Sequence, residues 1–302
     1  MSPPPGAPMV GRAAPLPSAM RSLVIFLTIS RAGNLPTIWS NCLAGWWLGG
    51  HGNPGRLTVL LLGASLLYIG GAFLNDALDA DSDRQHRRSR PIPSGLFPAR
   101  LAVQGGIAFL AAGLLCLFGI SRLTGTLGLG VSLLAVTFNL THRSFVLSPG
   151  LLGGCRLFLY AAAASAGANG TGGWAVWCGI AAATYAAGVR LLATIEAPPR
   201  RDQYWPVVLL AAPIALALTM DVNEFRVRGI ALSAVVGLNS ILALRRMLWP
   251  AARDIAKTAA ALTAGMILVD WLAVVDAPIE MAFVFVLLFA AVFLLQRGTT
   301  TV

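Results

Sequence analysis

Four polar side chains within one short stretch carry the strongest chemical signal in the chain. They follow the spacing N-D-x-x-D-x-x-x-D and are Asn75, Asp76, Asp79 and Asp83. On a helix, positions i, i+4 and i+8 share a face, so Asn75, Asp79 and Asp83 form one stripe. Asp76 lies beside that stripe, and Asp81 points away from it. Like charges at this spacing repel, and a helix C-terminus disfavours anions. The pattern therefore predicts a cation at the stripe.

Two sources of that cation are open. The first is the arginine-rich run directly after the stripe, residues 84–90, which would form a salt-bridged cap at the membrane edge. The second is Mg²⁺, which prefers hard oxygen ligands and binds through one or two carboxylates together with substrate phosphates. In that case Arg88 and Arg90 are suited to bind the phosphates, because guanidinium groups match phosphate oxygens.

The rest of the chain predicts an all-α polytopic membrane bundle that positions this stripe. Hydrophobic residues make up 57% of the chain, charged residues only 11%, and the mean hydropathy is +0.74. A soluble domain carries roughly a quarter charged residues. Apolar runs long enough to cross a bilayer recur along the chain. The ten expected spans are 22–49, 57–77, 98–121, 124–139, 149–167, 173–193, 205–220, 227–247, 253–273 and 279–296.

The positive charge predicts an orientation and argues against a nucleic-acid partner. The formal net charge is +10, but the basic residues lie between apolar segments. With a cytoplasmic N-terminus and ten crossings, fifteen basic residues lie inside and four outside, as the positive-inside rule requires. The stripe and the segment near Glu196 then share the cytoplasmic face. Arginine-rich composition with a single lysine is compatible with a high-GC bacterium, and we expect its inner or plasma membrane.

The ends of the chain differ from the apolar array. Residues 1–20 are rich in Pro, Gly and Ala without a helical period, and we expect a disordered tail. No signal-peptide cleavage site follows the first apolar run. Residues 21–298 are expected to form one domain. The four cysteines lie within or at the edges of apolar stretches without metal-ligand spacing and are expected to pack as small apolar residues.

The stripe and its tail resemble a known family. The acidic spacing at the end of the second span, followed by R-P-I-P-S-G at 90–95, is similar to the UbiA superfamily of intramembrane prenyltransferases. Residues 31–45 and 141–167 resemble the first helix and the segment between the fourth and fifth helices of that family. The resemblance implies about nine helices around a central cavity. It also implies Mg²⁺-dependent transfer of a prenyl group from a polyprenyl diphosphate to a small acceptor.

The same resemblance assigns roles to individual residues. It implies metal binding by Asn75, Asp76, Asp79, Asp83 and Glu196. It implies diphosphate binding by Arg88, Arg90 and Arg143, and it makes Asp79, Asp83 and Arg143 the catalytic set. The second acidic motif of the family carries two or more aspartates, whereas this chain has Glu196, with Asp202 beyond two prolines. In this, and in Gly154-Cys155-Arg156, it is similar to the EboC-like members of the superfamily.

Four further polar residues inside apolar segments are candidates for the cavity and the acceptor site: Asn34, Arg156, Tyr160 and Arg190. A buried charge is expensive in a membrane unless it is paired or faces a wet cavity. The alternative for each is a structural contact with another helix, and Asp270 is a possible partner of a buried arginine. The alternative for the whole protein is a non-catalytic or transport-related membrane protein that keeps the fold. The acceptor is left open.

Overall fold

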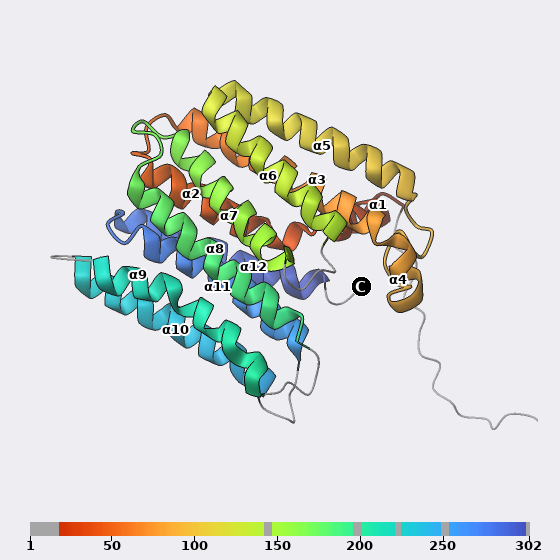
Figure 1. The fold of residues 1–302 in the computed structure, drawn as a ribbon. Helices are drawn as coiled ribbons and strands as arrows, with labels where there is room; N and C mark the ends of the chain where they lie inside the picture. The colour runs from red at the N-terminus through yellow and green to blue at the C-terminus, as the bar shows by residue number, and fades with distance from the viewer. Residues whose placement is uncertain (1–17, 142–146, 196–200, 221–224, 249–253, 300–302) are drawn as a thin grey trace, which may run out of the picture.

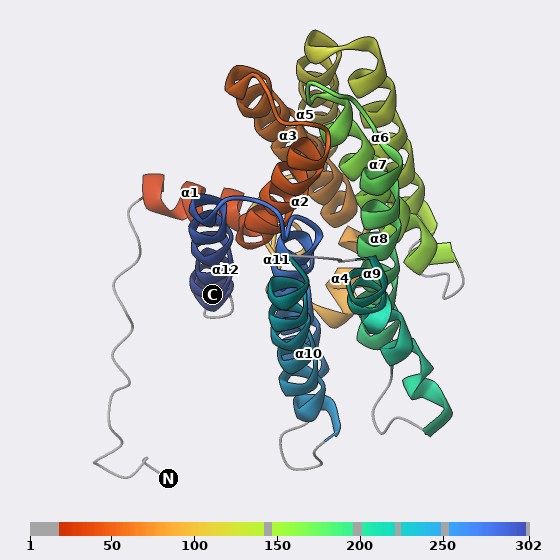
Figure 2. The ribbon, with the colours of Figure 1, turned by 90° about the vertical axis from the view of Figure 1, so that its left-hand side faces the viewer.

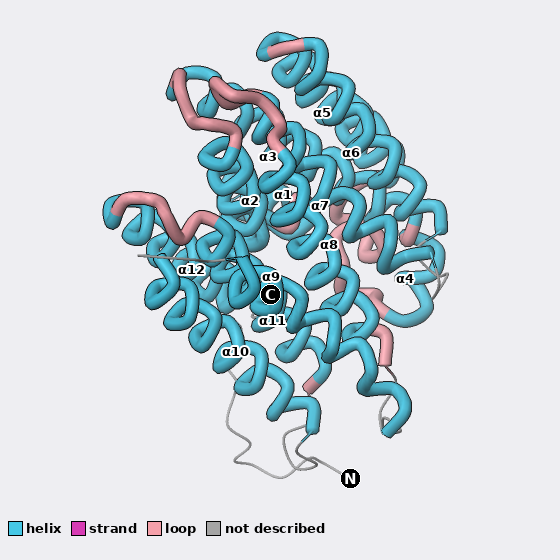
Figure 3. The backbone as a smooth tube through the Cα atoms, turned by 60° about the vertical axis from the view of Figure 1, so that its left-hand side comes forward, coloured by secondary structure: helices cyan, strands magenta, loops and turns pink. Residues whose placement is uncertain are grey.

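A computed structural model describes residues 18–141, 147–195, 201–220, 225–248 and 254–299, and these residues fold into helices and short connections (Figure 3). No strand occurs within those ranges. The apolar composition explains this result, because a segment inside a bilayer must satisfy its backbone hydrogen bonds internally. The elements are α1 (Ser18–Ile29), η1 (Ala32–Asn34), α2 (Leu35–Leu48), α3 (Pro54–Leu78), α4 (Ala80–His86), α5 (Ala99–Ile120), α6 (Arg122–Thr141), α7 (Leu147–Ser165), α8 (Gly173–Ala193), η2 (Arg201–Ala211), α9 (Ala212–Met220), α10 (Arg226–Leu248), α11 (Ile255–Ala273) and α12 (Ile279–Thr299).

The membrane bundle predicted from the sequence is confirmed. Eight of the described helices are long and apolar enough to cross a bilayer, α3, α5, α6, α7, α8, α10, α11 and α12. The protein is therefore an integral membrane protein. The N-terminal tail expected at residues 1–20 lies outside the described part of the chain up to residue 17, and α1 already begins at Ser18.

Two of the ten expected spans are broken helices. The first divides into α1 and α2 at Arg31, whose φ of 49° lies in the left-handed region. Pro36 then occupies the first turn of α2, where its missing N–H costs nothing. The seventh span begins as the 3-10 helix η2, which contains Pro206, and continues as α9. Proline removes a backbone donor and clashes with the preceding turn, so it favours this break.

The helices form two groups that meet at the middle of the molecule (Figures 1 and 2). In the first group α3 packs on α5, α5 on α6, α6 on α7, and α2 contacts both α3 and α7. In the second group α8 packs against η2 and α9, α9 packs on α10, and α10 on α11. The helices α7, α8, α11 and α2 join the two groups, and α12 lies against α11, α2 and η1.

Glycines allow α3 and α5 to approach each other closely. A Cβ added to Gly70 would lie 2.8 Å from the carbonyl oxygen of Gly106, and one added to Gly113 would lie 2.8 Å from that of Gly63. Only glycine fits at such a backbone contact, and small residues promote it in membrane helices. The contact fixes α3, the helix that ends in the acidic stripe.

Candidate active site

The acidic stripe lies where α3 passes into α4. The Asp79 N–H donates to the Asn75 carbonyl at 2.9 Å, and the Asp83 N–H donates to the Asp79 carbonyl at 2.8 Å. The helical repeat therefore continues through Asp79, as the spacing predicts. Asn75, Asp76 and Asp83 are buried, and Asp79 is half-buried.

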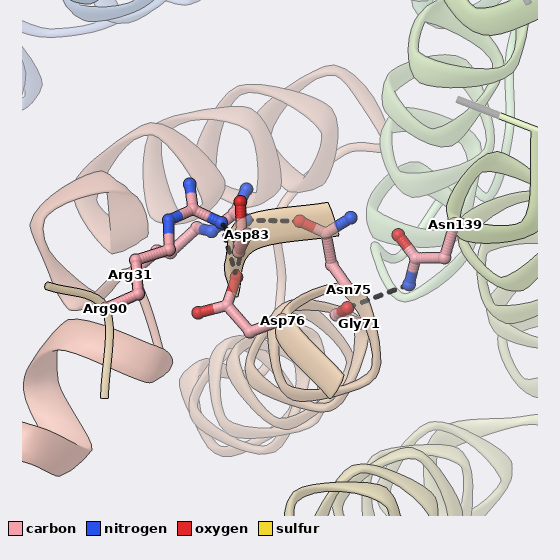
Figure 4. A network of polar contacts seen from close by, with 7 residues as sticks. All are labelled: Arg31, Gly71, Asn75, Asp76, Asp83, Arg90 and Asn139. Carbon is pink, nitrogen blue, oxygen red and sulfur yellow. Dashed lines mark hydrogen bonds and ion pairs between the residues drawn. The ribbon is translucent and has the colours of Figure 1, made fainter. Parts of the chain in front are cut away.

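Two arginines provide the positive charge at this stripe (Figure 4). Arg31 donates from Nη2 to the side-chain oxygen of Asn75 and, at 2.8 Å, to Asp76 Oδ1. Arg90 Nη1 lies 2.6 Å from Asp83 Oδ2 and 3.6 Å from Asp76 Oδ1. Buried carboxylates are stable only when they are paired, and these two arginines provide that pairing.

The R-P-I-P-S-G segment brings Arg90 back to the stripe. The Arg90 N–H donates to the Arg87 carbonyl at 3.1 Å, and the Ser94 N–H donates to the Arg90 carbonyl at 3.0 Å. The Ser94 hydroxyl donates to the Pro91 carbonyl at 3.1 Å. Gly95 has a φ of 78°, which a side chain would strain. The motif is thus a tight turn that reverses the chain and directs its first residue toward Asp83.

The remaining charges of this segment point elsewhere. Arg88 is exposed and donates from Nε to the Arg84 carbonyl at 3.0 Å. Asp81 is 91% exposed and pairs with Arg84 at 2.8 Å, on the side that the helical spacing predicts. Of the arginines in this run that the sequence nominates for phosphate binding, only Arg90 contacts the stripe. Two further predicted residues, Arg143 and Glu196, lie outside the described residues.

Arg31 was not predicted as a site residue. Its side chain comes from a segment 45 residues before Asp76 and reaches the stripe because the chain turns sharply between α1 and α2. Helix α1 is held at this end of α3 by ring contacts of Phe26 with Phe73 and Phe109, at 5.8 and 6.3 Å between centroids. The available signal was a charge that interrupts an apolar run, which is costly in a membrane without a partner.

A cavity of about 170 Å³ opens beside the stripe, between α2, α3, α6 and α7. Arg31 and Asn75 lie on its wall. Most of the other lining side chains are apolar, among them Leu67, Phe138 and Leu159. Such a chamber is suited to a hydrocarbon group attached to a polar head that lies near the stripe.

The predicted cavity residues occupy different places. Arg156 lines this cavity and donates to the carbonyl of Thr37 at 2.7 Å and to its hydroxyl at 2.9 Å. Tyr160 is fully buried in the core and does not line the cavity. Arg190 donates to the Ser148 hydroxyl at 2.7 Å, and its guanidinium lies 5.5 Å from the centre of the Phe138 ring.

Two asparagines stand at the edges of the site. Asn139, on α6, lines the cavity and donates to the Gly71 carbonyl at 2.9 Å (Figure 4). Asn34, in η1, lines a different cavity and accepts a hydrogen bond from Gln296 at 3.2 Å. The polar residues of the first helix therefore do not all face one chamber.

The stripe has the chemistry of a divalent-cation site, although its side chains are engaged by arginine. Within the described ranges no three acidic, histidine or cysteine side chains are gathered as a ready-made metal site. However, the oxygens of Asn75 and Asp76 converge on one guanidinium nitrogen, and those of Asp76 and Asp83 approach another. Hard oxygen donors that already converge on positive charge fit Mg²⁺ completed by phosphate oxygens.

Comparison with known proteins agrees with this geometry. The model of the UbiA prenyltransferase family matches residues 34–299. The chain is 31% identical over 124 residues to 4-hydroxybenzoate octaprenyltransferase of Nitrosomonas eutropha, across 39% of this chain and 41% of that protein. It is 37% identical over 76 residues to protoheme IX farnesyltransferase of a Synechococcus strain, across 24% and 23% of the two chains. The matches thus span 41% and 23% of the length of these two relatives.

Solved structures share the fold. A UbiA homolog from Archaeoglobus fulgidus, bound to GPP and Mg²⁺, superposes with a TM-score of 0.65 at 16% identity, over 90% of this chain and 99% of that one. A solved structure from work on digeranylgeranylglyceryl phosphate synthase superposes with a TM-score of 0.59 at 15% identity, over 90% of this chain and 99% of that one. The family match covers most of the residues that form the bundle and the stripe. This chain therefore belongs to the UbiA prenyltransferase family.

Proposed function

We propose that the protein transfers a prenyl group from a polyprenyl diphosphate to a small acceptor within the membrane, in a reaction that depends on Mg²⁺. One observation carries this proposal: buried carboxylates and two arginines converge beside an apolar cavity, on whose wall Arg31 lies. An allylic diphosphate combines a long hydrocarbon chain with a highly charged head. The site offers matching surroundings for both parts.

The diphosphate head would lie at the stripe. Its metal would be held by Asn75, Asp76, Asp79 and Asp83, with Glu196 from the second acidic motif. When bound, Mg²⁺ supplies neutralisation of the phosphate charge. Arg90 and Arg31 are placed to exchange their carboxylate contacts for phosphate oxygens, for which guanidinium is well suited. Arg190 lies close enough to Arg31 for their charges to repel, which favours an anion near both. Arg88 and Arg143 are further candidates for the diphosphate.

The apolar cavity would hold the first part of the hydrocarbon chain. The bond between C1 of the prenyl group and the diphosphate oxygen breaks, and its electron pair leaves with the diphosphate. The acceptor atom bonds to C1 and loses its proton to the released diphosphate. Water would capture the allylic cation, so the apolar walls formed by Leu67, Phe138 and Leu159 protect it. Arg156 provides a polar group on the same wall, and its hydrogen bonds to the buried Thr37 hold it there.

We also propose that the stripe faces the cytoplasm, where a water-soluble metal is available. The basic segments gathered at that end of the helices support this orientation. Cysteine labelling from either side of sealed vesicles at an exposed position, Ser89→Cys, tests it in a background without native cysteines. Labelling only from the cytoplasmic side is expected, and labelling from the other side would reverse the orientation.

The function is tested with purified protein in nanodiscs. Geranylgeranyl or farnesyl diphosphate binding is measured with and without Mg²⁺, and diphosphate release is measured with a panel of acceptors. We expect metal-dependent binding and acceptor-dependent release, and Asp79→Ala and Asp83→Ala should abolish release while the protein stays folded. Asp81→Asn is the matched control, because that aspartate points away from the stripe.

The same experiment separates catalysis from the non-catalytic alternative. Full release by the Asp79→Ala, Asp83→Ala double variant would remove the stripe from the reaction. Tight donor binding with no release for any acceptor would favour a membrane protein that keeps the fold and binds prenyl diphosphates without transferring them.

A further inference from the structure

A second cavity, of about 360 Å³, lies between α1, η1, α11 and α12. It shares one lining residue, Arg31, with the apolar cavity beside the stripe. The Arg31 side chain is 39% exposed although it lies inside the bundle, because it borders both chambers. The two cavities therefore approach each other at the residue that bonds to Asn75 and Asp76.

The second cavity has a larger share of polar lining residues than the cavity beside the stripe, although most of its surface is apolar as well. Five of the eight residues that line the second cavity are polar: Thr28, Arg31, Asn34, Thr263 and Gln296. The eight include one cation and no acid. The bonds from Arg31 to the stripe both use Nη2, so Nη1 and Nε are the nitrogens with which it can bind another group. This chamber favours a neutral or anionic molecule with hydrogen-bonding groups.

The last helix supplies an amide to this chamber. The apolar window of helix α12, Ile279–Gln296, has a mean hydropathy of 2.4, and only 11% of it is buried, as expected of a lipid-facing helix. Near its end, Gln296 donates to Asn34 Oδ1 at 3.2 Å and to the Ala260 carbonyl at 3.5 Å. A partly buried amide is costly without such partners. Gln296 thus joins α12 to η1 and α11.

The backbone of α12 also comes close to η1 at this point. A Cβ added to Gly33 would lie 3.5 Å from the backbone carbon of Leu295 and 3.6 Å from the nitrogen of Gln296. Helix α12 therefore forms the outer wall of the chamber, with Gln296 as its polar residue.

We infer that the second cavity binds the prenyl acceptor, and that Gln296 determines which acceptor fits. This inference rests on the proposed function. The acceptor class is a small hydroxylated molecule without positive charge. A hydrocarbon donor and a hydroxylated acceptor need separate chambers, of which the acceptor chamber has the larger share of hydrogen-bonding side chains. The two chambers must meet at the carbon that bears the diphosphate. Arg31 marks that meeting point. The acceptor oxygen bonds to C1 of the prenyl group, the diphosphate leaves with the C1–O electron pair, and the hydroxyl proton passes to the diphosphate.

The test compares Gln296→Leu, Gln296→Glu and the lipid-facing control Leu294→Ala. Diphosphate release from farnesyl diphosphate is measured in nanodiscs with glycerol, glycerol phosphate, 4-hydroxybenzoate and choline. We expect release with a hydroxylated neutral or anionic compound and none with choline. Gln296→Leu should lower kcat/KM for that acceptor at least tenfold, while the Kd for farnesyl diphosphate with Mg²⁺ stays within twofold. Gln296→Glu should lower the rate with anionic acceptors at least tenfold more than with glycerol, because it adds a negative charge.

The outcomes distinguish this inference from the proposed function. An active wild-type protein whose acceptor preference is unchanged by both Gln296 variants overturns the inference alone. The same conclusion follows if the variants change the Kd for farnesyl diphosphate instead of the acceptor KM. A wild-type protein that releases no diphosphate with any acceptor overturns both. Thermal unfolding of each variant shows whether a loss of diphosphate release reflects misfolding. Misfolding would lower the rates with all acceptors alike, whereas Gln296→Glu should lower the rate with anionic acceptors more than the rate with glycerol.

Discussion

Two groups of buried polar residues are built in opposite ways. At the stripe, Asp76 and Asp83 contact arginine nitrogens at 2.8 and 2.6 Å and lie beside a cavity. In the middle of the bundle, Asp270 on α11 is 1% exposed, and its Oδ2 accepts a hydrogen bond from the Ser40 hydroxyl at 2.5 Å. Arg156 acts on Asp270 electrostatically, but its own hydrogen bonds go to Thr37.

The second group, which we call the Asp270 cluster (Ser40, Asn41, Tyr160 and Asp270), is less completely bonded. Asp270 Oδ1, both amide atoms of Asn41 and the Tyr160 hydroxyl have no hydrogen-bond partner of normal geometry among the described residues. The cluster lies where α2, α7 and α11 meet. The carboxylates of the stripe therefore pair with arginines beside a cavity, where we propose that a ligand takes over these contacts, whereas the Asp270 cluster is buried between helices that it joins. Ion pairs that lie beside a cavity, as at the stripe, are therefore candidates for a ligand site. Polar side chains that are buried away from any cavity, as in the Asp270 cluster, are instead part of the helix packing.

The largest expected effect comes from the stripe. Asp83→Asn keeps the shape of the side chain and removes its charge, so turnover should fall about 1,000-fold and Mg²⁺ affinity about 10- to 100-fold. Thermal unfolding without Mg²⁺ should change little in comparison, since Arg90 retains Asp76 as a neighbour. Steady-state diphosphate release and metal titration check this. Wild-type turnover in the variant would place the stripe in the same structural class as the Asp270 cluster.

The next effect separates stability from function. Asp270→Ala removes the acceptor of the Ser40 hydroxyl and the opposite charge near Arg156, and should destabilise the fold by about 3 kcal/mol. Asp270→Asn should cost less, because its amide oxygen can still accept that bond. Unfolding in detergent and the Kd for farnesyl diphosphate are measured together. If Asp270→Asn weakens donor binding tenfold at unchanged stability, Asp270 contributes to the site and not only to the fold.

A smaller effect concerns the backbone of Arg31. Both Arg31→Ala and Arg31→Gly remove the guanidinium and should weaken donor binding to the same degree. Glycine tolerates the φ of 49° at this position, so Arg31→Gly should be more stable than Arg31→Ala by about 1 kcal/mol. Denaturant unfolding of the two variants measures the difference. A more stable alanine variant would show that the turn between α1 and α2 changes once the guanidinium is gone.

The smallest effect is expected at the exposed pair of Asp81 and Arg84. Ion pairs on the surface contribute about 0.5 kcal/mol or less, so Asp81→Asn should alter neither unfolding nor donor binding beyond that amount. Unfolding and donor binding of this variant serve as the reference for the variants described above. A tenfold loss of donor binding would extend the site to the outer face of α4.

Most of the fold could be predicted from the sequence because bilayer thickness determines the length of apolar runs. The stripe could be predicted as well, since its register depends only on the helical repeat from Asn75 to Asp83. The breaks at Arg31 and in η2 were not predicted. A left-handed arginine is stable there because Asn75 and Asp76, far away in the sequence, hold its side chain, and these contacts are tertiary.

The partners of the site residues were also beyond prediction. Arg31 and Asp76 are 45 positions apart, and Asn34 and Gln296 are 262 positions apart. Such contacts depend on how α12 and α1 pack, for which local spacing carries no information. The prediction that Asp270 could pair with a buried arginine was right about proximity to Arg156, while the direct hydrogen bond goes to Ser40.

The glycine contacts between α3 and α5 have a consequence for the surrounding lipid. Packing of backbone against backbone depends on van der Waals contact and not on the difference between water and hydrocarbon. Stretching or thinning of the bilayer should therefore leave the spacing of these two helices unchanged. Only 11% of the apolar window of helix α12 is buried within the protein, so most of this helix is not fixed by such backbone contacts. Acyl-chain length should accordingly tune the chamber next to α12 more than the acidic end of α3.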